Sequence, residues 1–376
     1  MKKILVPFLA IACFLLTSGL SSGESSDQLP PPLWSYTVDE EMNINLAIRK
    51  VGDQLYLKNS GIGDATVVIL NDKDGKAKTT FRTNDQEYTD WGYMTETGSK
   101  GEIYSLYTEK GAYRLRATNS KGEILWSKTF NEKVDEHSGI TGIFMLNNDT
   151  FLVYIRLSTY KYDVYKFDSS GKQLLKKQFN EFIHDYQNGY LITYSSLGKT
   201  KARISFYDAN LSLKFKRDIT FGKDDFRGIS SDGTVYYTGY DKLKKTTTVI
   251  ARNTKGTLLW SKTIPGELGR DNYYPNNPRK EGLLIEIGNT LYRFNAKGLV
   301  SKKAFAEKPD FQIGQDLSVL VKDGTRLTLL NDKLEVLRTA NIATSPQSRT
   351  YKYFGNGVVY TYDWKSAVLS KIDWMP

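Results

Sequence analysis

The sequence predicts an all-β fold, an eight-bladed β-propeller whose last blade is completed by a strand from the N-terminus. Short runs rich in Val, Ile, Tyr, Phe and Thr alternate with turn residues, and almost no segment shows the 3.6-residue apolar period of a helix. Turns of one kind recur at intervals of about 34 to 49 residues, close to the length of one four-stranded blade. Residues 253–262 also repeat residues 119–128 almost letter for letter.

Two families of turn separate the expected strands, and their Gly, Asn and Asp residues tolerate the positive φ of tight hairpins. The family that joins a third strand to a fourth comprises Asp74-Gly75, Lys121-Gly122, Ser170-Gly171, Asn210-Leu211, Lys255-Gly256, Lys297-Gly298 and Asp332-Lys333. The family that joins a first strand to a second comprises Gly52, 98–101, Asn148-Asp149, Asn188-Gly189, Asp232-Gly233, Glu281-Gly282, Asp316 and Asn356-Gly357. Together they predict complete units at 43–82, 88–130, 139–179, 182–219, 226–264, 271–305 and 311–342.

The C-terminal remainder of the chain supplies only three strands, at about 351–354, 358–363 and 367–374. Residues 33–38 match 125–130 and 259–264, both of which are fourth strands, so the missing strand is expected from the N-terminus. Closure by a strand from the opposite terminus leaves no open sheet edge at the seam. We therefore expect eight blades, with seven as the alternative if one unit is misread.

Residues 1–23 have the pattern of a bacterial-type secretory signal peptide. Lys2 and Lys3 precede the apolar run 4–16, which is followed by small residues and is too short for a permanent transmembrane helix. Lipidation at Cys13 is the alternative, but Leu9 lies one place too early for it. The expected organisation is a signal peptide at 1–23, a linker at 24–32 and one propeller domain at 33–376, in a protein that is secreted or associated with the cell wall.

Composition limits what the exported chain can be. Its lone cysteine, Cys13, leaves with the signal, so the fold must be held by its core rather than by disulfides. No second apolar stretch could span a membrane, and we expect a soluble monomer. The 52 basic and 42 acidic residues give a formal charge of +10, which favours anionic neighbours such as wall polymers, acidic lipid or nucleic acid.

Residues 117–126 and 251–260 resemble the tryptophan-docking repeat of quinoprotein-like (PQQ-like) β-propellers. In that repeat an Ala starts the turn, an Asp or Asn follows, and a Gly precedes a Trp that packs between blades. The resemblance extends over the predicted propeller as an architecture and is sharpest in these two segments and in the N-terminal strand. It implies that Trp34, Trp126 and Trp260 pack between neighbouring sheets. The family includes quinone-dependent dehydrogenases and non-catalytic scaffolds such as propeller lipoproteins that assist outer-membrane protein assembly, and a fold does not choose between them.

The sequence departs from this family in ways that favour the scaffold over the enzyme. The turns carry Lys-Gly where the family has a longer turn with Thr-Gly, and the third and fourth units replace the Trp by Leu174 or Leu175 and by Lys214 or Phe215. The adjacent cysteine pair of many quinone-dependent dehydrogenases is missing. The resemblance therefore implies the fold more strongly than the cofactor, and we expect no cofactor.

Motifs for catalysis and metal binding are weak. His137 and His184 lie beside carboxylates and could serve as a base or a metal ligand, but three or four ligands at metal spacing do not occur. We expect His137 to lie in an exposed loop and His184 to line the channel. The segment from Asp72 to Gly75 resembles the start of a calcium loop but lacks the preceding acid and the closing Glu, so it is expected to be a hairpin turn. No catalytic or metal-binding residue is predicted.

Charge is more informative than motif. Loops from a second strand to a third lean basic, whereas the connectors from a fourth strand to the next first strand are acidic, and both lie on one face of a propeller. We expect the acids near the channel mouth and the lysines towards the rim, a pattern that suits a protein partner. Residues 271–280 form a polar, aromatic insertion, either a sugar-binding loop or a rigid turn. The candidate binding face comprises Lys110, Lys161, Lys199, Lys242, Lys244, Lys245, Tyr273, Tyr274 and Arg279.

The function predicted from the sequence is binding without catalysis. The expected partner is a protein or a cell-wall polysaccharide surface. The alternative is a propeller enzyme, either a quinoprotein-like oxidoreductase or a polysaccharide-cleaving enzyme. Nucleic acid ranks last among the partners, because the acidic connectors interrupt any continuous basic track.

Overall fold

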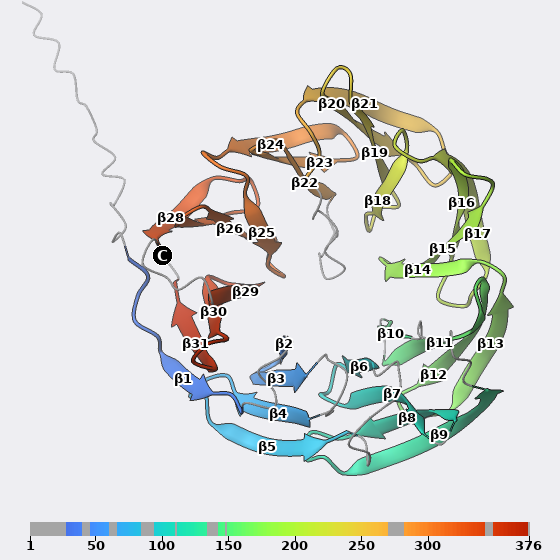
Figure 1. Ribbon diagram of the computed structural model, residues 1–376, viewed down its shortest axis with the longest axis vertical. Coiled ribbons are helices and arrows are strands. Elements are labelled where there is room, and N and C mark those ends of the chain that lie inside the picture. Colours follow the sequence, from blue (N-terminus) through green and yellow to red (C-terminus); the bar gives the residue numbers. More distant parts are fainter. Residues whose placement is uncertain are drawn as a thin grey trace, which may run out of the picture.

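Eight small antiparallel sheets stand around a ring in the computed structural model (Figure 1). The structure describes residues 28–39, 46–59, 66–83, 94–109, 111–133, 142–146, 149–269, 282–342 and 349–374, and these contain strands and turns but no α-helix. The predicted eight-bladed β-propeller is confirmed, and the seven-bladed alternative is wrong.

Each blade runs from an inner strand near the axis to an outer strand on the circumference (Figure 1). Blade 1 contains β2 (Leu46–Val51), β3 (Gln54–Asn59), β4 (Thr66–Asn71) and β5 (Ala77–Arg82), and blade 2 contains β6 (Met94–Thr97), β7 (Ile103–Glu109), β8 (Ala112–Thr118) and β9 (Ile124–Lys133). Blade 3 contains β10 (Gly142–Met145), β11 (Thr150–Ser158), β12 (Lys161–Asp168) and β13 (Gln173–Phe179). Blade 4 contains β14 (Phe182–Gln187), β15 (Tyr190–Ser196), β16 (Lys201–Tyr207) and β17 (Leu213–Thr220).

Blades 5 to 8 follow the same order along the chain. Blade 5 contains β18 (Asp225–Ile229), β19 (Val235–Asp241), β20 (Thr246–Arg252) and β21 (Leu258–Pro265), and blade 6 contains β22 (Leu283–Ile287), β23 (Thr290–Asn295) and β24 (Gly298–Ala304). Blade 7 contains β25 (Asp310–Ile313), β26 (Val319–Asp323), β27 (Arg326–Leu330) and β28 (Val336–Asn341). Blade 8 contains β29 (Arg349–Gly355), β30 (Val358–Asp363), β31 (Val368–Asp373) and β1 (Trp34–Thr37). The inner strand predicted for blade 6 falls in 270–281, outside the described residues.

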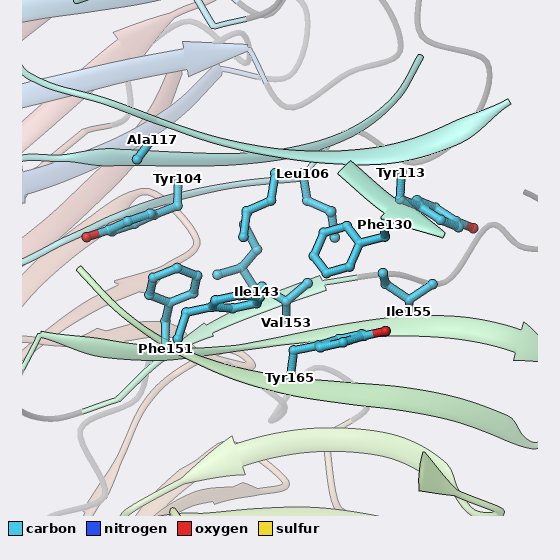
Figure 2. Packing of buried hydrophobic residues seen from close by; sticks show 12 residues of the cluster. Tyr104, Leu106, Tyr113, Ala117, Phe130, Ile143, Phe151, Val153, Ile155 and Tyr165 are labelled. Atoms are coloured by element: carbon cyan, nitrogen blue, oxygen red, sulfur yellow. The ribbon is translucent and has the colours of Figure 1, made fainter. Parts of the chain in front are cut away.

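The core lies between the blades rather than in one central mass. Middle strands are covered on both faces by neighbouring sheets, so β7 is buried over most of its length, whereas the outer strand β13 alternates between exposed and half-buried residues. Figure 2 shows one such interface, where Tyr104 and Leu106 of blade 2 face Phe151 and Val153 of blade 3. The rings of Tyr104 and Phe151 lie 4.3 Å apart. Aromatic side chains therefore join each sheet to the next.

Three tryptophans bridge neighbouring blades as predicted. The indole N–H of Trp126 donates to the carbonyl of Ser169 at 2.9 Å, and that of Trp260 donates to Asn295 at 3.0 Å. Trp34 donates in the same way to the carbonyl of Asp72, at 2.9 Å. Each acceptor lies at the turn between the third and fourth strands of the next blade, so the ring packs against the turn while its only polar atom is satisfied.

In blades 3 and 4 the turn residue is matched in size to the side chain that docks on it. Gly171 has a φ of +83°, and a Cβ there would lie 2.7 Å from the Trp126 ring. At the equivalent turn of blade 4, Leu211 takes the same left-handed conformation, with a φ of 59°. Its side chain is buried in a cluster with Leu175, the smaller residue that replaces the Trp on the preceding blade. The Leu211 side chain fills the space of a missing indole. Its burial offsets the cost of about 1 to 2 kcal/mol of holding a non-glycine residue in the left-handed conformation.

The structure also shows which residues replace the missing tryptophans. Leu175 and Phe215 occupy the register of Trp126, opposite Lys166 and Phe206 respectively. The Phe215 ring stacks on Phe206 with a centroid distance of 4.2 Å. The other two candidates, Leu174 and Lys214, are exposed instead.

The N-terminal strand closes the ring. β1 pairs antiparallel with β31, with Trp34 opposite Lys371, and completes a sheet of order β1-β31-β30-β29. The backbone N–H groups of Leu33 and Val38 extend the ladder to the carbonyls of Lys371 and Ala367. The predicted closure by residues 33–38 is thereby confirmed.

Asp72 lies at the centre of this seam. It belongs to the turn between β4 and β5, and its side chain is 2.7 Å from the Lys50 ammonium and 3.0 Å from that of Lys371. The Tyr360 hydroxyl donates to the same carboxylate at 2.6 Å, and the Asp72 carbonyl accepts from Trp34 and from Lys371. The expected hairpin turn is confirmed, and it also joins blade 1 to three strands of blade 8, namely β1, β30 and β31.

Protonation of Asp72 should weaken the seam. Burial alone would raise its pKa, but hydrogen bonds from Lys50, Tyr360 and Lys371 outweigh burial and hold the pKa below the ordinary 3.8. Because the folded-state pKa is depressed, the carboxylate stabilises the fold above about pH 4, and this contribution is lost as the pH falls through the folded value.

We predict that Asp72→Asn lowers the free energy of unfolding at pH 7 by about 3 to 5 kcal/mol, because it leaves the buried Lys371 ammonium and the half-buried Lys50 ammonium without a counter-charge. Asp74→Asn, in the same turn but exposed, is the matched control and should change the free energy by less than about 0.5 kcal/mol. Denaturant unfolding should show the Asp72→Asn deficit shrinking below pH 4. A deficit that is absent, or equal at pH 7 and pH 3, would contradict this assignment.

Candidate binding face

The described candidates lie on the predicted face, formed by the turns from second to third strands and the connectors between blades; we call it the lysine face. Lys161 is the first residue of β12, Lys199 lies in the β15–β16 turn, and three more lysines lie in the β19–β20 turn, namely Lys242, Lys244 and Lys245. The other candidates, Lys110, Tyr273, Tyr274 and Arg279, fall outside the described residues, as does His137.

The β19–β20 turn projects an aliphatic side chain between lysines. Leu243 is 97% exposed. The turn is nevertheless well ordered by hydrogen bonds, because the Asp241 carboxylate accepts from the backbone N–H groups of Leu243 and Lys244 at 3.0 and 3.1 Å. The Lys245 carbonyl accepts from Gly266 of the following connector at 2.9 Å. A fixed turn that holds a bare leucine at its tip is an arrangement suited to contact with another molecule.

Hydrogen bonds join this turn to its neighbours in one continuous surface. The connector after β17 begins with Phe221, which is 50% exposed and whose backbone N–H donates to Thr200 of the β15–β16 turn at 3.0 Å. The carbonyl of the next residue, Gly222, accepts from Tyr240 at the end of β19, also at 3.0 Å. Leu197, 43% exposed, lies in the same β15–β16 turn. Three exposed apolar side chains of blades 4 and 5 are therefore carried by segments that bond to one another.

We call this surface the apolar–lysine patch; it comprises Leu197, Lys199, Lys201, Phe221, Lys223, Lys242, Leu243, Lys244 and Lys245. Tyr160 and Trp364, at the turns of blades 3 and 8, are also exposed on the lysine face. Exposed aliphatic residues also begin four outer strands beside the turns of the opposite face, namely Ile124, Leu213, Leu258 and Val336. The apolar–lysine patch differs from them because its exposed side chains stand on hydrogen-bonded segments of two neighbouring blades.

Some of the predicted acids tie the connectors to the blades. Glu181 accepts from the hydroxyls of Thr193, Ser205 and Tyr207, which are all on strands of its own blade. Asp225 accepts from the backbone N–H of Gly222 at 2.9 Å. These carboxylates hold the loops in place, and the gathering of acids around the channel mouth stays a prediction.

His184 packs among aromatic rings. Its imidazole lies edge-on to Tyr194 at 4.7 Å and 6.3 Å from Phe226 of the next blade. The neighbouring carboxylate of Asp185 bonds to the backbone of Tyr186 and to the amide of Gln187. Within the described ranges, no three His, Cys, Asp or Glu side chains are grouped to hold a metal ion.

Lys58 is a buried basic group near the end of β3. Burial lowers its pKa to about 8, although Glu96 opposes the shift. Such a pKa suits a lysine nucleophile, but only 7% of the residue is exposed and its ammonium donates to the Thr95 carbonyl at 2.9 Å. The geometry fits a structural role, in which β3 of blade 1 is bonded to β6 of blade 2.

Comparison with known proteins does not select a function. The chain matches no protein-family model and no curated protein. Among solved structures, BamB from Moraxella catarrhalis is similar with 12% identity over 91% of this chain and 99% of that chain, at a TM-score of 0.48. Dihydro-heme d1 dehydrogenase NirN in complex with DHE has 10% identity over 79% of this chain and 66% of that chain, at a TM-score of 0.49.

Kuenenia stuttgartiensis hydrazine synthase is also similar, with 11% identity over 94% of this chain and 98% of that chain, at a TM-score of 0.40. At identities this low the similarity concerns the fold alone, and function has to be argued from the surface. The described segments include no helix of the length and apolarity needed to cross a membrane.

The order of the β19–β20 turn can be tested directly. We predict that Asp241→Ala speeds amide hydrogen exchange of Leu243 and Lys244 about tenfold, since each loses a hydrogen bond worth roughly 0.5 to 1.5 kcal/mol. Asp241→Asn keeps an acceptor oxygen and should exchange at nearly the wild-type rate. Equal exchange in wild type and Asp241→Ala would show that the carboxylate does not order the turn.

Proposed function

We propose that this protein is a non-catalytic binding scaffold that docks a protein partner on the lysine face. The observation that carries the proposal is the apolar–lysine patch, in which exposed Leu197, Phe221 and Leu243 stand on hydrogen-bonded segments. Burial of one such side chain on binding contributes about 1.5 to 3 kcal/mol. Because the turns are ordered before binding, little of this gain is spent on fixing loops.

The charge of the patch indicates the chemistry of the partner. Six lysines surround the three apolar side chains, whereas the nearby Asp241 and Asp225 accept hydrogen bonds from the backbone. A partner with an apolar cavity rimmed by carboxylates would complement this arrangement. Charges at the rim speed association, while the apolar anchors hold the complex.

The expected signal peptide at 1–23 places the search for a partner outside the cell. Export would bring the lysine face to extracellular or wall-bound proteins.

The test uses residues 24–376 as bait with extracellular and wall fractions, followed by affinity measurement on the captured protein. We predict that Phe221→Ser combined with Leu243→Ser weakens binding at least about tenfold, because two apolar contacts are lost. Leu213→Ser combined with Leu258→Ser is the matched control, since both residues are leucines about as exposed as Phe221 and neither belongs to the patch. Equal affinity of the two double variants would exclude the lysine face as the docking site.

A further inference from the structure

The positive charge of the protein is concentrated on its circumference. The eight outermost strands, β5, β9, β13, β17, β21, β24, β28 and β1, contain thirteen Lys or Arg and two Asp or Glu residues. Their excess of eleven positive charges exceeds the +10 of the whole chain, so the remaining residues sum to −1. We call the surface of these strands the outer wall.

The two acids of the outer wall are already engaged with bases. Glu132 lies 3.0 Å from the Lys176 ammonium, and Asp218 binds the Arg203 guanidinium through both oxygens, at 2.6 and 3.0 Å. Neither carboxylate repels an anion as a bare charge would. The exposed bases of the outer wall are Lys78, Arg82, Lys176, Lys214, Lys216, Lys262 and Lys302, which are distributed over blades 1, 3, 4, 5 and 6. Two of them are paired with acids, Lys176 with Glu132 and Asp163 and Lys214 with Asp208.

Exposed aliphatic side chains accompany these bases at one repeated register. We call the position that Trp34, Trp126 and Trp260 occupy in their outer strands the docking position. The residue just before it is aliphatic and between 42% and 61% exposed in six blades, namely Leu33, Leu125, Leu174, Leu259, Val300 and Leu337. In blades 1 and 4 the same position holds Lys78 and Lys214. Side chains that dock between blades leave their sequence neighbours pointing outward, because successive residues alternate across a strand.

We propose that the outer wall is a second binding surface, which takes a flexible phosphodiester polymer of polyol units wrapped along the circumference. Its phosphates meet the lysines, and the C–H groups of its polyol units lie against the leucines. The chemistry and the shape of the wall favour this ligand over other polyanions. A flat lipid bilayer would touch only one or two blades of a convex ring (Figure 1).

Nucleic acid is a poorer match to the outer wall. Single strands bind through bases stacked on exposed aromatic rings. On the outer wall, Trp34 is buried and Trp126, Trp260 and Phe215 are half-buried between blades. The exposed apolar side chains there are aliphatic, which suits a polymer that lacks bases. This surface is distinct from the lysine face, so either proposal can fail alone.

The experiment compares two variants of equal net charge in binding to immobilised poly(glycerol phosphate). The wall variant replaces Lys78, Lys216, Lys262 and Lys302 by Gln, and the face variant replaces Lys199, Lys242, Lys244 and Lys245 by Gln. Each removes four positive charges from residues 24–376. Affinity is measured at salt concentrations from about 50 to 200 mM, because phosphate contacts make binding salt-dependent.

The wall variant should bind at least about tenfold more weakly than wild type, and its log–log salt slope should be about 3 smaller, at roughly 0.7 for each lost contact. The face variant should keep the wild-type slope. Equal weakening of both variants would show that only net charge matters and would overturn the proposal. Tighter binding to an oligo-dT strand or to phosphatidylglycerol vesicles than to the polymer would overturn it as well.

Discussion

The whole ring depends on one contact between the ends of the chain, the docking of blade 8 on blade 1. Trp34 enters from the N-terminal strand, and its indole bonds to the carbonyl of Asp72 at 2.9 Å. Lys371 from the C-terminal sheet bonds to the same carbonyl and pairs with the same carboxylate. Because no disulfide can join the described residues, this seam must hold by burial and hydrogen bonding alone. The buried Asp72 carboxylate stabilises the fold only while both lysines, Lys50 and Lys371, are present to pair with it. The seam therefore favours this one pairing of blade 8 with blade 1.

A closed ring has consequences for binding. Each blade is held on both sides, so its turns and connectors are fixed relative to those of its neighbours, as the hydrogen bonds from Phe221 to Thr200 and from Tyr240 to Gly222 show. The matched sizes of Gly171 with Trp126 and of Leu211 with Leu175 favour a single arrangement at those two interfaces. A rigid ring can then present two surfaces of different chemistry, an apolar and basic patch on one face and a basic, aliphatic wall around the edge.

The sequence predicts the architecture well because its signals are local. Turn chemistry, strand composition and the repeat at 119–128 and 253–262 lead to eight blades and to the closing strand without any knowledge of contacts. The contacts of Asp72 cannot be predicted in this way, because Lys50, Tyr360 and Lys371 come together only in three dimensions. Leu243 stands between two predicted lysines, but the pattern of charges does not indicate that an aliphatic residue between them is exposed. The basic excess of the outer wall emerges only once the order of strands in each blade is known.

Ring closure by the N-terminal strand is tested most directly by two truncations. A chain that begins after Val38 loses β1 and the Trp34 indole, whereas a chain that begins at Gln28 keeps both and serves as the control. We predict that the first truncation lowers the free energy of unfolding relative to the control by at least about 3 to 5 kcal/mol, the cost of removing one buried tryptophan. Its thermal midpoint should fall accordingly. Equal free energies and equal midpoints for the two chains would show that the strand is a tail and does not close the last blade.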